Sequence, residues 1–353
     1  MARNLSIVGL ALFVGMVFAE ILLRQLPETT LGFRFESGRF KPPREFVLDK
    51  THNRFGFHDV ELTSKPERTR RVVLLGDSFV AGLAVSIPQT VTRRVAHHLL
   101  DAGLAAYDVL AIASPGIGPK VELKALVELG PEFEPDIVIS VLFSGNDIAD
   151  SLDPLDRREL LAGGAALRPY DGGPARYSTE EARYLFASWS VLNQLVSQRL
   201  TVAARKRSYR GIPLNYLVYA DEPADTWERA WANTEQILVE TRNTAAELGA
   251  SYAVVSIPSA EAVLGEAGKQ QLIESYPDMK GRPWDFDLPD RRLAAICERH
   301  DIPFLALRPA FRRHIEGGGP PAYWKYDAHW TALGHDLAGS EIARLIARLE
   351  ARR

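Results

Sequence analysis

Two short motifs near opposite ends of the chain carry the side chains of a nucleophile and its base. The triplet at 76–78 ends in Ser78, and the triplet at 327–329 places Asp327 two residues before His329. A serine hydroxyl is a weak nucleophile until a base accepts its proton, and a histidine oriented by a carboxylate is such a base near neutral pH. These residue types predict Ser78 as nucleophile, His329 as general base and Asp327 as the orienting acid.

Two further motifs supply candidate hydrogen-bond donors. Gly116 lies within SPGIGP, and Asn146 lies within SGND. Acyl transfer by a serine passes through a tetrahedral intermediate whose oxyanion needs preorganised donors, each worth about 3–4 kcal/mol. The backbone N–H groups of Ser78 and Gly116 and the side-chain amide of Asn146 are the three predicted donors. A glycine suits its place because no side chain projects toward the substrate.

Each of these residues also has an ordinary structural explanation. Ser78 could form a turn after a strand, and Asn146 could cap a helix. Gly116 could be glycine only because its backbone needs a positive φ. Asp327 and His329 could form a surface pair or part of a metal site, but no further cluster with metal-ligand spacing accompanies them. The combination favours one active site over four accidents, and neither a metal nor a cofactor is expected.

Short apolar runs alternate with amphipathic segments along most of the chain. Strands are predicted at 72–75, 107–113, 137–143, 252–257 and 303–307, and helices at 88–102, 119–129, 226–248, 288–300 and 332–350. This alternation indicates a parallel sheet covered by helices on both faces. Ligands of such sheets bind beyond the carboxyl ends of the strands. Ser78, Gly116 and Asn146 each follow a predicted strand, so they are expected at one edge.

The organisation around this alternation predicts three segments. Residues 1–26 form an N-terminal membrane anchor or signal segment, residues 27–70 a connector, and residues 71–353 the main domain. An insertion at about 150–225 interrupts the alternation, and such a long connection should have structure of its own. It could be a cap over the site or a packing element.

The N-terminal segment predicts export. After Arg3 comes LSIVGLALFVGMVFAEILL, in which Glu20 is the one charge. As a helix this stretch would be about 28 Å long, close to the hydrocarbon thickness of a bilayer. The first interpretation is a single-pass anchor with the main domain on the extracytoplasmic side. The alternatives are cleavage near Ala19, which gives a secreted or periplasmic protein, and a buried helix.

Composition excludes several classes of protein. The chain has 353 residues, of which 46% are hydrophobic and 25% charged, with a net charge of −3, as in ordinary globular proteins. No stripe of basic residues interleaved with aromatics is present, so nucleic acid is not an expected partner. Cys297 is the single cysteine, which excludes an intramolecular disulfide.

The four motifs together resemble the SGNH, or GDSL-type, hydrolase family. The matching stretches are GDSFVAG, SPGIGP, SGND and DAHWTALGH, in the family's order between residues 72 and 338. The resemblance implies an α/β fold of flavodoxin-like type, a three-layer α/β/α sandwich with strand order 2-1-3-4-5. It also implies that Ser78 is the nucleophile, His329 the base, and Gly116 and Asn146 oxyanion donors.

The sequence departs from the family's pattern at two places. The common acid position, three residues before the histidine, holds Tyr326, and Asp327 stands one residue later. That spacing resembles bacterial polysaccharide-modifying relatives. Thr331 stands where such relatives often carry asparagine, although threonine can still cap the following helix. The upstream stretch THNRFGFHDVE also resembles the segment before GDS in membrane-tethered members, where it is expected to brace the first strand.

The resemblance implies a carboxylic ester hydrolase. The expected substrate is a short acyl ester, O-acetyl above all, of an envelope or extracellular carbohydrate, cleaved through an acyl-enzyme. The alternatives are an O-acyltransferase for exported polysaccharide, a lipase or phospholipase, and a catalytically silent glycan-binding protein. For a lipase, apolar residues of the insertion would line an acyl channel: Trp189, Leu192, Leu195 and Leu200. The oligomeric state stays open.

Overall fold

The structure is a computed structural model, and it describes residues 2–26, 34–36, 39–41, 45–104, 106–152, 191–192, 195–196, 211–220 and 225–351. The chain divides into two compact units. One comprises residues 1–45 and 168–209, and the other comprises residues 46–167 and 210–353. All predicted site residues belong to the second unit. The boundary at residue 45 falls inside the predicted connector.

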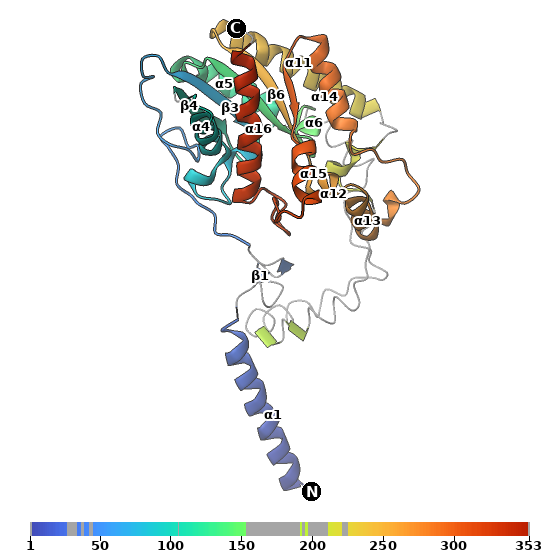
Figure 1. Ribbon diagram of the computed structural model, residues 1–353. Coiled ribbons are helices and arrows are strands. Elements are labelled where there is room, and N and C mark those ends of the chain that lie inside the picture. The colour runs from blue at the N-terminus through green and yellow to red at the C-terminus, as the bar shows by residue number, and fades with distance from the viewer. Residues whose placement is uncertain are drawn as a thin grey trace. The chain divides into compact units, whose positions relative to one another are not determined.

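A five-stranded parallel sheet forms the centre of the second unit (Figure 1). Its strands are β3 (Arg70–Gly76), β4 (Tyr107–Ala113), β5 (Ile137–Phe143), β6 (Ser251–Ile257) and β7 (Phe304–Ala306). They lie in the order β4-β3-β5-β6-β7, and every neighbouring pair is parallel. Numbered along the chain, this is the order 2-1-3-4-5, so the predicted flavodoxin-like α/β fold is confirmed.

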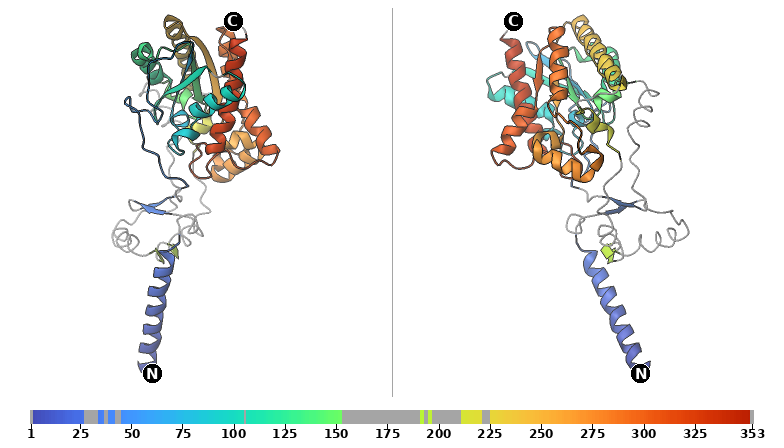
Figure 2. Two further views of the ribbon diagram at one scale, coloured as in Figure 1. Left: turned by 60° about the vertical axis from the view of Figure 1, so that its left-hand side comes forward. Right: turned by 90° about the vertical axis from the view of Figure 1, so that its right-hand side faces the viewer.

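The sheet is apolar on both faces because helices cover both. Val73 and Leu75 of β3 belong to one hydrophobic cluster, whereas Val72 and Leu74 belong to the other, and all four are fully buried. The first cluster includes side chains of α5 (Pro119–Phe133), α11 (Asp225–Glu247) and α14 (Leu288–Arg299). The second includes side chains of α4 (Val91–Asp101) and α16 (Ala332–Glu350), which lie side by side (Figures 1 and 2). The continuous apolar run of β3 therefore follows from burial on two sides.

Each predicted strand and helix has an observed counterpart with slightly different ends. The additional short elements are α3 (Ser78–Ala81), η1 (Ile87–Gln89), α6 (Asp147–Asp150), α10 (Leu214–Leu217), α12 (Ala260–Leu264), α13 (Glu266–Ser275), η3 (Pro277–Met279) and α15 (Arg308–Glu316). Most of the predicted insertion at 150–225, with Trp189 and Leu200, lies outside the described residues. The suggested acyl channel there stays a prediction.

The segment from residue 46 to β3 is attached to the second unit by buried polar groups. The Asp59 carboxylate accepts a hydrogen bond from the Ala111 N–H at 2.8 Å, and it lies 3.5 Å from Arg93 Nε. The His58 ring nitrogens lie 2.7 Å from Thr51 O and 3.1 Å from Val85 O. These contacts hold the upstream segment against the strand and helix that flank the site.

The first unit contains α1 (Ala2–Leu23) and an antiparallel pair, β1 (Arg34–Glu36) and β2 (Arg39–Lys41). The predicted membrane span is not supported: within the described residues, no helix combines the length and apolar character needed to cross a bilayer. In this unit the Glu20 carboxylate accepts hydrogen bonds from Arg24 Nε at 2.8 Å and from the Val191 N–H at 2.9 Å.

We expect Gly76→Ala to destabilise the second unit, because a Cβ at this position would lie 2.3 Å from Val80 Cγ2 and 3.2 Å from Val141 O. Overpacking of this kind costs about 1–3 kcal/mol. Urea denaturation measures the change. Gly317→Ala is the matched control, since its Cβ would meet no atom closer than 3.3 Å. Equal free energies of unfolding for the two variants would contradict the close packing of Val80 and Val141 around Gly76.

Candidate active site

The predicted nucleophile lies at the carboxyl end of a central strand. β3 ends at Gly76, and α3 begins at Ser78, which is half-buried. The intervening Asp77 caps this helix, because its carboxylate accepts a hydrogen bond from the Phe79 N–H at 2.9 Å. The chain turns so tightly at Gly76 that Val80 leaves no space for a side chain, and only glycine fits there. The local chain therefore directs the Ser78 hydroxyl to the edge where parallel sheets bind ligands.

Ser78, His329 and Asp327 form one hydrogen-bonded series. Ser78 Oγ lies 2.7 Å from His329 Nε2, and His329 Nδ1 lies 2.5 Å from Asp327 Oδ1. The imidazole also packs on the Phe79 ring, with a centroid separation of 4.8 Å. This is the arrangement of a nucleophile, a base and an orienting acid. The structure thus brings together the three residues whose types predicted catalysis.

The two-residue spacing between acid and base depends on an unusual backbone. Ala328 has φ 65°, in the left-handed region that costs a non-glycine residue about 1–2 kcal/mol. Trp324 holds the loop: its N–H donates to His329 O at 2.8 Å, and its carbonyl accepts from the Ala328 N–H at 3.1 Å. The left-handed turn lets the Asp327 carboxylate reach the imidazole of His329, two residues later. Tyr326, at the family's more common acid position, is exposed.

Electrostatics keeps the pair in the state that catalysis needs. Burial by itself lowers the pKa of His329, but its hydrogen bond and charge interaction with Asp327 outweigh burial and raise that pKa above its usual value. Burial raises the pKa of Asp327, but the hydrogen bond with His329 outweighs it, and the net pKa is lowered. Asp327 is therefore ionised at neutral pH and makes His329 a stronger base.

The predicted oxyanion donors come from neighbouring strand ends. Gly116 follows β4 with φ 77°, a conformation that favours glycine, and a side chain there would meet only open space. Asn146 follows β5, and its amide nitrogen donates to Asp150 Oδ2 at 2.8 Å and Asp147 Oδ1 at 3.2 Å. A Cβ on Gly118 would lie 2.6 Å from the Asp150 Cβ, so the two loops are in contact. Both residues follow strands that neighbour β3 in the sheet, and the Asn146 amide is held by two acidic side chains, so their role as oxyanion donors stays a prediction.

A cavity of about 120 Å³ opens beside Ser78. Its lining combines Asp327 and His329 with mostly apolar residues: Phe46, Leu48, Phe79, Gly82, Leu83, Ala84, Pro115, Trp330 and His335. Phe46 and Leu48 belong to the predicted connector, and His335 belongs to the last helix. Sequence reasoning gave none of the three a role in the site. No motif marks Phe46 or Leu48, and His335, the last residue of DAHWTALGH, was assigned no function.

Sequence reasoning also missed two buried acids behind the site. Glu122 on α5 and Asp147 on α6 are fully buried, and burial raises the pKa of each well above its usual value, with the neighbouring Asp77 raising it further. Burial raises the pKa of Asp77 itself to about 6. Burial therefore favours the protonated form of both acids more than water would.

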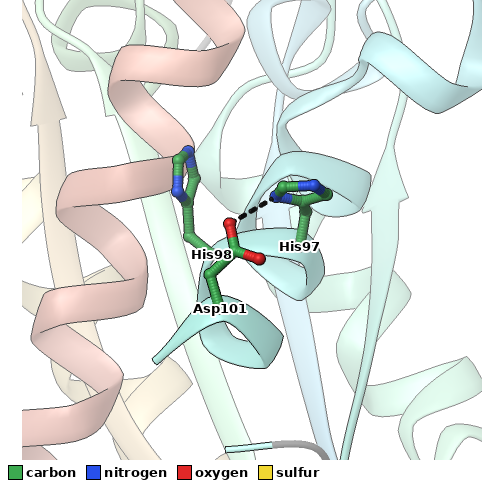
Figure 3. Close-up of side chains that lie close together, drawn as sticks. All are labelled: His97, His98 and Asp101. Carbon is green, nitrogen blue, oxygen red and sulfur yellow. Dashed lines mark ion pairs between the residues drawn. The ribbon is translucent and has the colours of Figure 1, made fainter. Parts of the chain in front are cut away.

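The described residues contain one group of side chains with the spacing of metal ligands, and it is not at this site. His97, His98 and Asp101 lie together on α4 (Figure 3). His97 Nδ1 lies 3.0 Å from Asp101 Oδ2, and His98 Nε2 lies 2.9 Å from Asp336 Oδ1. These contacts account for the group as surface ion pairs.

The fold and the site together define an α/β protein with a flavodoxin-like sheet and a Ser-His-Asp series at its carboxyl edge. No family model matches the chain, and no curated protein matches it. Similar solved structures include TesA (14% identity, 79% of this chain and 99% of that one, TM-score 0.43) and a lipase/acylhydrolase from Enterococcus faecalis (16%, 79% and 95%, 0.40). Another is an acetylxylan esterase from Geobacillus stearothermophilus (13%, 81% and 95%, 0.40). At these low values, the fold assignment rests on the observed strand order.

We expect the His329 imidazole to titrate above the ordinary value of about 6.5 in the parent protein. In Asp327→Asn the titration should move to lower pH, because burial still disfavours the cation while the carboxylate that stabilises it is gone. NMR of the ring protons against pH measures both values. Asp101→Asn, which removes a surface carboxylate near His97, should leave the His329 titration unchanged. A titration that is the same in parent and Asp327→Asn would contradict the electrostatic role of Asp327.

Proposed function

We propose that the protein is a serine carboxylic ester hydrolase of the SGNH type that removes short acyl groups. One observation carries the proposal: the hydrogen-bonded series in which Ser78 Oγ lies 2.7 Å from His329 Nε2 and His329 Nδ1 lies 2.5 Å from Asp327 Oδ1. A surface ion pair of Asp327 and His329, or a helix cap at Ser78, would not require His329 to bond Ser78 and Asp327 at the same time. The series supports catalysis over a silent glycan-binding role.

The proposed reaction has two steps that use the same residues. His329 Nε2 accepts the Ser78 proton as Oγ attacks the ester carbonyl carbon, and then gives that proton to the departing alcohol. Water attacks the acyl-enzyme with His329 again as base, which releases the acid and restores Ser78. Asp327 stabilises the imidazolium that forms in each step.

The oxyanion of each tetrahedral intermediate would lie near the ends of β3, β4 and β5. The Ser78 and Gly116 backbone N–H groups are two proposed donors, and Asn146 is the third. An amide nitrogen carries two hydrogens. In our proposal one hydrogen of Asn146 stays with Asp150, 2.8 Å away, and the other leaves Asp147 Oδ1, 3.2 Å away, for the oxyanion. Asp150 would then keep the amide in place between turnovers.

The cavity size supports a short acyl group. An apolar cavity of about 150 Å³ is large enough for benzene. The cavity beside Ser78 measures about 120 Å³. A space of this size within the described residues suits an acyl group of a few carbons. A sugar ring, which is bulkier than benzene, does not fit, so a carbohydrate alcohol would have to lie outside the cavity while its acyl group lies inside.

We expect the full chain to hydrolyse p-nitrophenyl acetate, and we expect Ser78→Ala and His329→Ala each to reduce kcat by about 10⁴-fold or more, because residues of a triad act as one unit. Ser86→Ala and His97→Ala, which alter an exposed serine and an exposed histidine, are the matched controls and should retain activity. Equal rates for the parent and Ser78→Ala would refute the proposal. Acetyl transferred to an added glycan, in place of free acetate, would favour the O-acyltransferase.

We also propose that the catalytic unit acts outside the cytoplasm, on an envelope or extracellular carbohydrate. The support is the apolar run after Arg3 and the small residue Ala19 at a suitable cleavage position. Fusion of residues 1–45 to alkaline phosphatase, which is active only after export, tests this expectation. Replacing the run Val8–Val14 by polar residues should abolish phosphatase activity. An inactive parent fusion that is produced at a normal level would overturn the proposal.

A further inference from the structure

One polar side chain in the cavity beside Ser78 has no part in the proposed chemistry. His335 lies in the first turn of α16 and lines this cavity together with Ser78 and His329. His335 is 1% exposed. Within the part of the chain that the structure describes, its Nδ1 atom has no hydrogen-bond partner. A buried polar atom without a partner is costly. The other ring nitrogen, Nε2, lies beside Gly82, which also lines the cavity, so Nε2 is the atom with which a cavity occupant can pair.

Packing holds the ring of His335 in the cavity wall. A Cβ at Gly82 would lie 3.0 Å from His335 Cε1 and 3.4 Å from His335 Nε2, so the ring occupies the space that this glycine leaves open. On another side the Trp330 ring stands edge to face, with a centroid separation of 5.4 Å and an interplanar angle of 82°. Because two neighbours fix the His335 ring, the ring can discriminate between ligands according to where the ligand carries its polar atoms.

The ring is neutral when the enzyme works. Burial lowers the pKa of His335 to about 3, and the positive charges that His329 and His58 can carry lower it further. A neutral imidazole has one nitrogen that donates and one that accepts. A hydroxyl group both donates and accepts, so it can pair with Nε2 in either tautomer. A hydroxyl is therefore the ligand group that suits this ring best.

Apart from the proposed catalytic groups, the rest of the cavity offers a ligand few hydrogen-bond partners other than His335. The side chains of Phe46, Leu48, Leu83 and Ala84 line it with hydrocarbon. A hydroxyl that enters with the acyl group would lose its water and find its replacement partner at His335. A methyl group of the same size would leave His335 unpaired. Sites built to bond a hydroxyl reject the analogue that lacks it more strongly than apolar pockets reject an added methylene.

We propose that His335 is a specificity-determining residue that selects short acyl groups carrying a hydroxyl, of which glycolyl is the smallest. This inference rests on the proposed function, because the acyl group must be bonded to Ser78 Oγ to lie in the cavity. It extends the expected substrates from acetyl esters to hydroxyacyl esters. The bonds made and broken remain those of ester hydrolysis.

Two pairs of p-nitrophenyl esters of matched size test the inference. The first pair is glycolate and propionate, and the second is 3-hydroxypropionate and butyrate. For each pair, kcat/KM of the hydroxyl ester divided by that of the hydrocarbon ester is measured in the parent and in His335→Phe. The intrinsic reactivity of the esters cancels when the two enzymes are compared. We expect this ratio to fall about tenfold in His335→Phe for at least one pair, as the loss of about 1.4 kcal/mol implies.

The controls separate failure of this inference from failure of the proposed function. His97→Phe alters an exposed histidine on α4 and should keep the parent's ratio. If the parent cleaves acetate and propionate but its ratio equals that of His335→Phe in both pairs, the ester hydrolase stands and the role of His335 is overturned. If the parent cleaves none of the esters, including acetate, the proposed function fails and this inference fails with it.

A second measurement serves if His335→Phe does not fold, which thermal denaturation would reveal. The parent's ratios are then divided by the ratios of the hydroxide-catalysed rates of the same esters. The inference requires that the corrected value exceed one for at least one pair. A preference for the hydrocarbon ester in both pairs would overturn it and indicate that His335 pairs only with a resident water.

Discussion

The hydrogen bond between Ser78 Oγ and His329 Nε2 joins residues 251 positions apart, and the site depends on it. It can form only if β3 is central in the sheet and the loop before α16 returns to the same edge. The continuous apolar run of β3 fulfils the first condition, because it is buried on both faces. The packing of α16 beside α4 fulfils the second, since it brings the start of α16 to the carboxyl ends of the strands.

The strain at Ala328 and the charge on Asp327 serve the same purpose. The left-handed backbone at Ala328 shortens the path from acid to base, and two backbone hydrogen bonds to Trp324 offset its cost. The Asp327 carboxylate then outweighs the burial of His329, which alone would weaken the base. Position 326, three residues before the histidine, holds a tyrosine. The turn at Ala328 lets Asp327 take the acid's place beside the His329 ring, so the change affects only this loop.

The cavity beside Ser78 has both apolar and polar walls. Phe46 and Leu48 close the cavity from a segment that Asp59 and His58 attach to the strands, so a connector becomes part of the site. Behind the strand ends, Asn146 is held by Asp147 and Asp150. His335 completes the cavity as a neutral polar group among hydrocarbon, which is the basis for our proposal that hydroxyacyl groups are preferred.

The amino-acid sequence by itself determined the elements and the chemical types. Apolar runs and helical periodicity are local properties, so the strands ending before Ser78, Gly116 and Asn146 could be predicted with nearly their observed ends. The parallel sheet followed from their alternation, whereas the strand order was implied only by the resemblance of the motifs. The predicted membrane span is not supported within the described residues, and export stays a proposal. Only the tertiary structure decided the rest: that Ala328 turns left-handed, that carboxylates hold Asn146, and that Phe46 and His335 share a cavity with Ser78. Those relations join residues far apart in the chain, and their energies depend on burial, which no single stretch of sequence specifies.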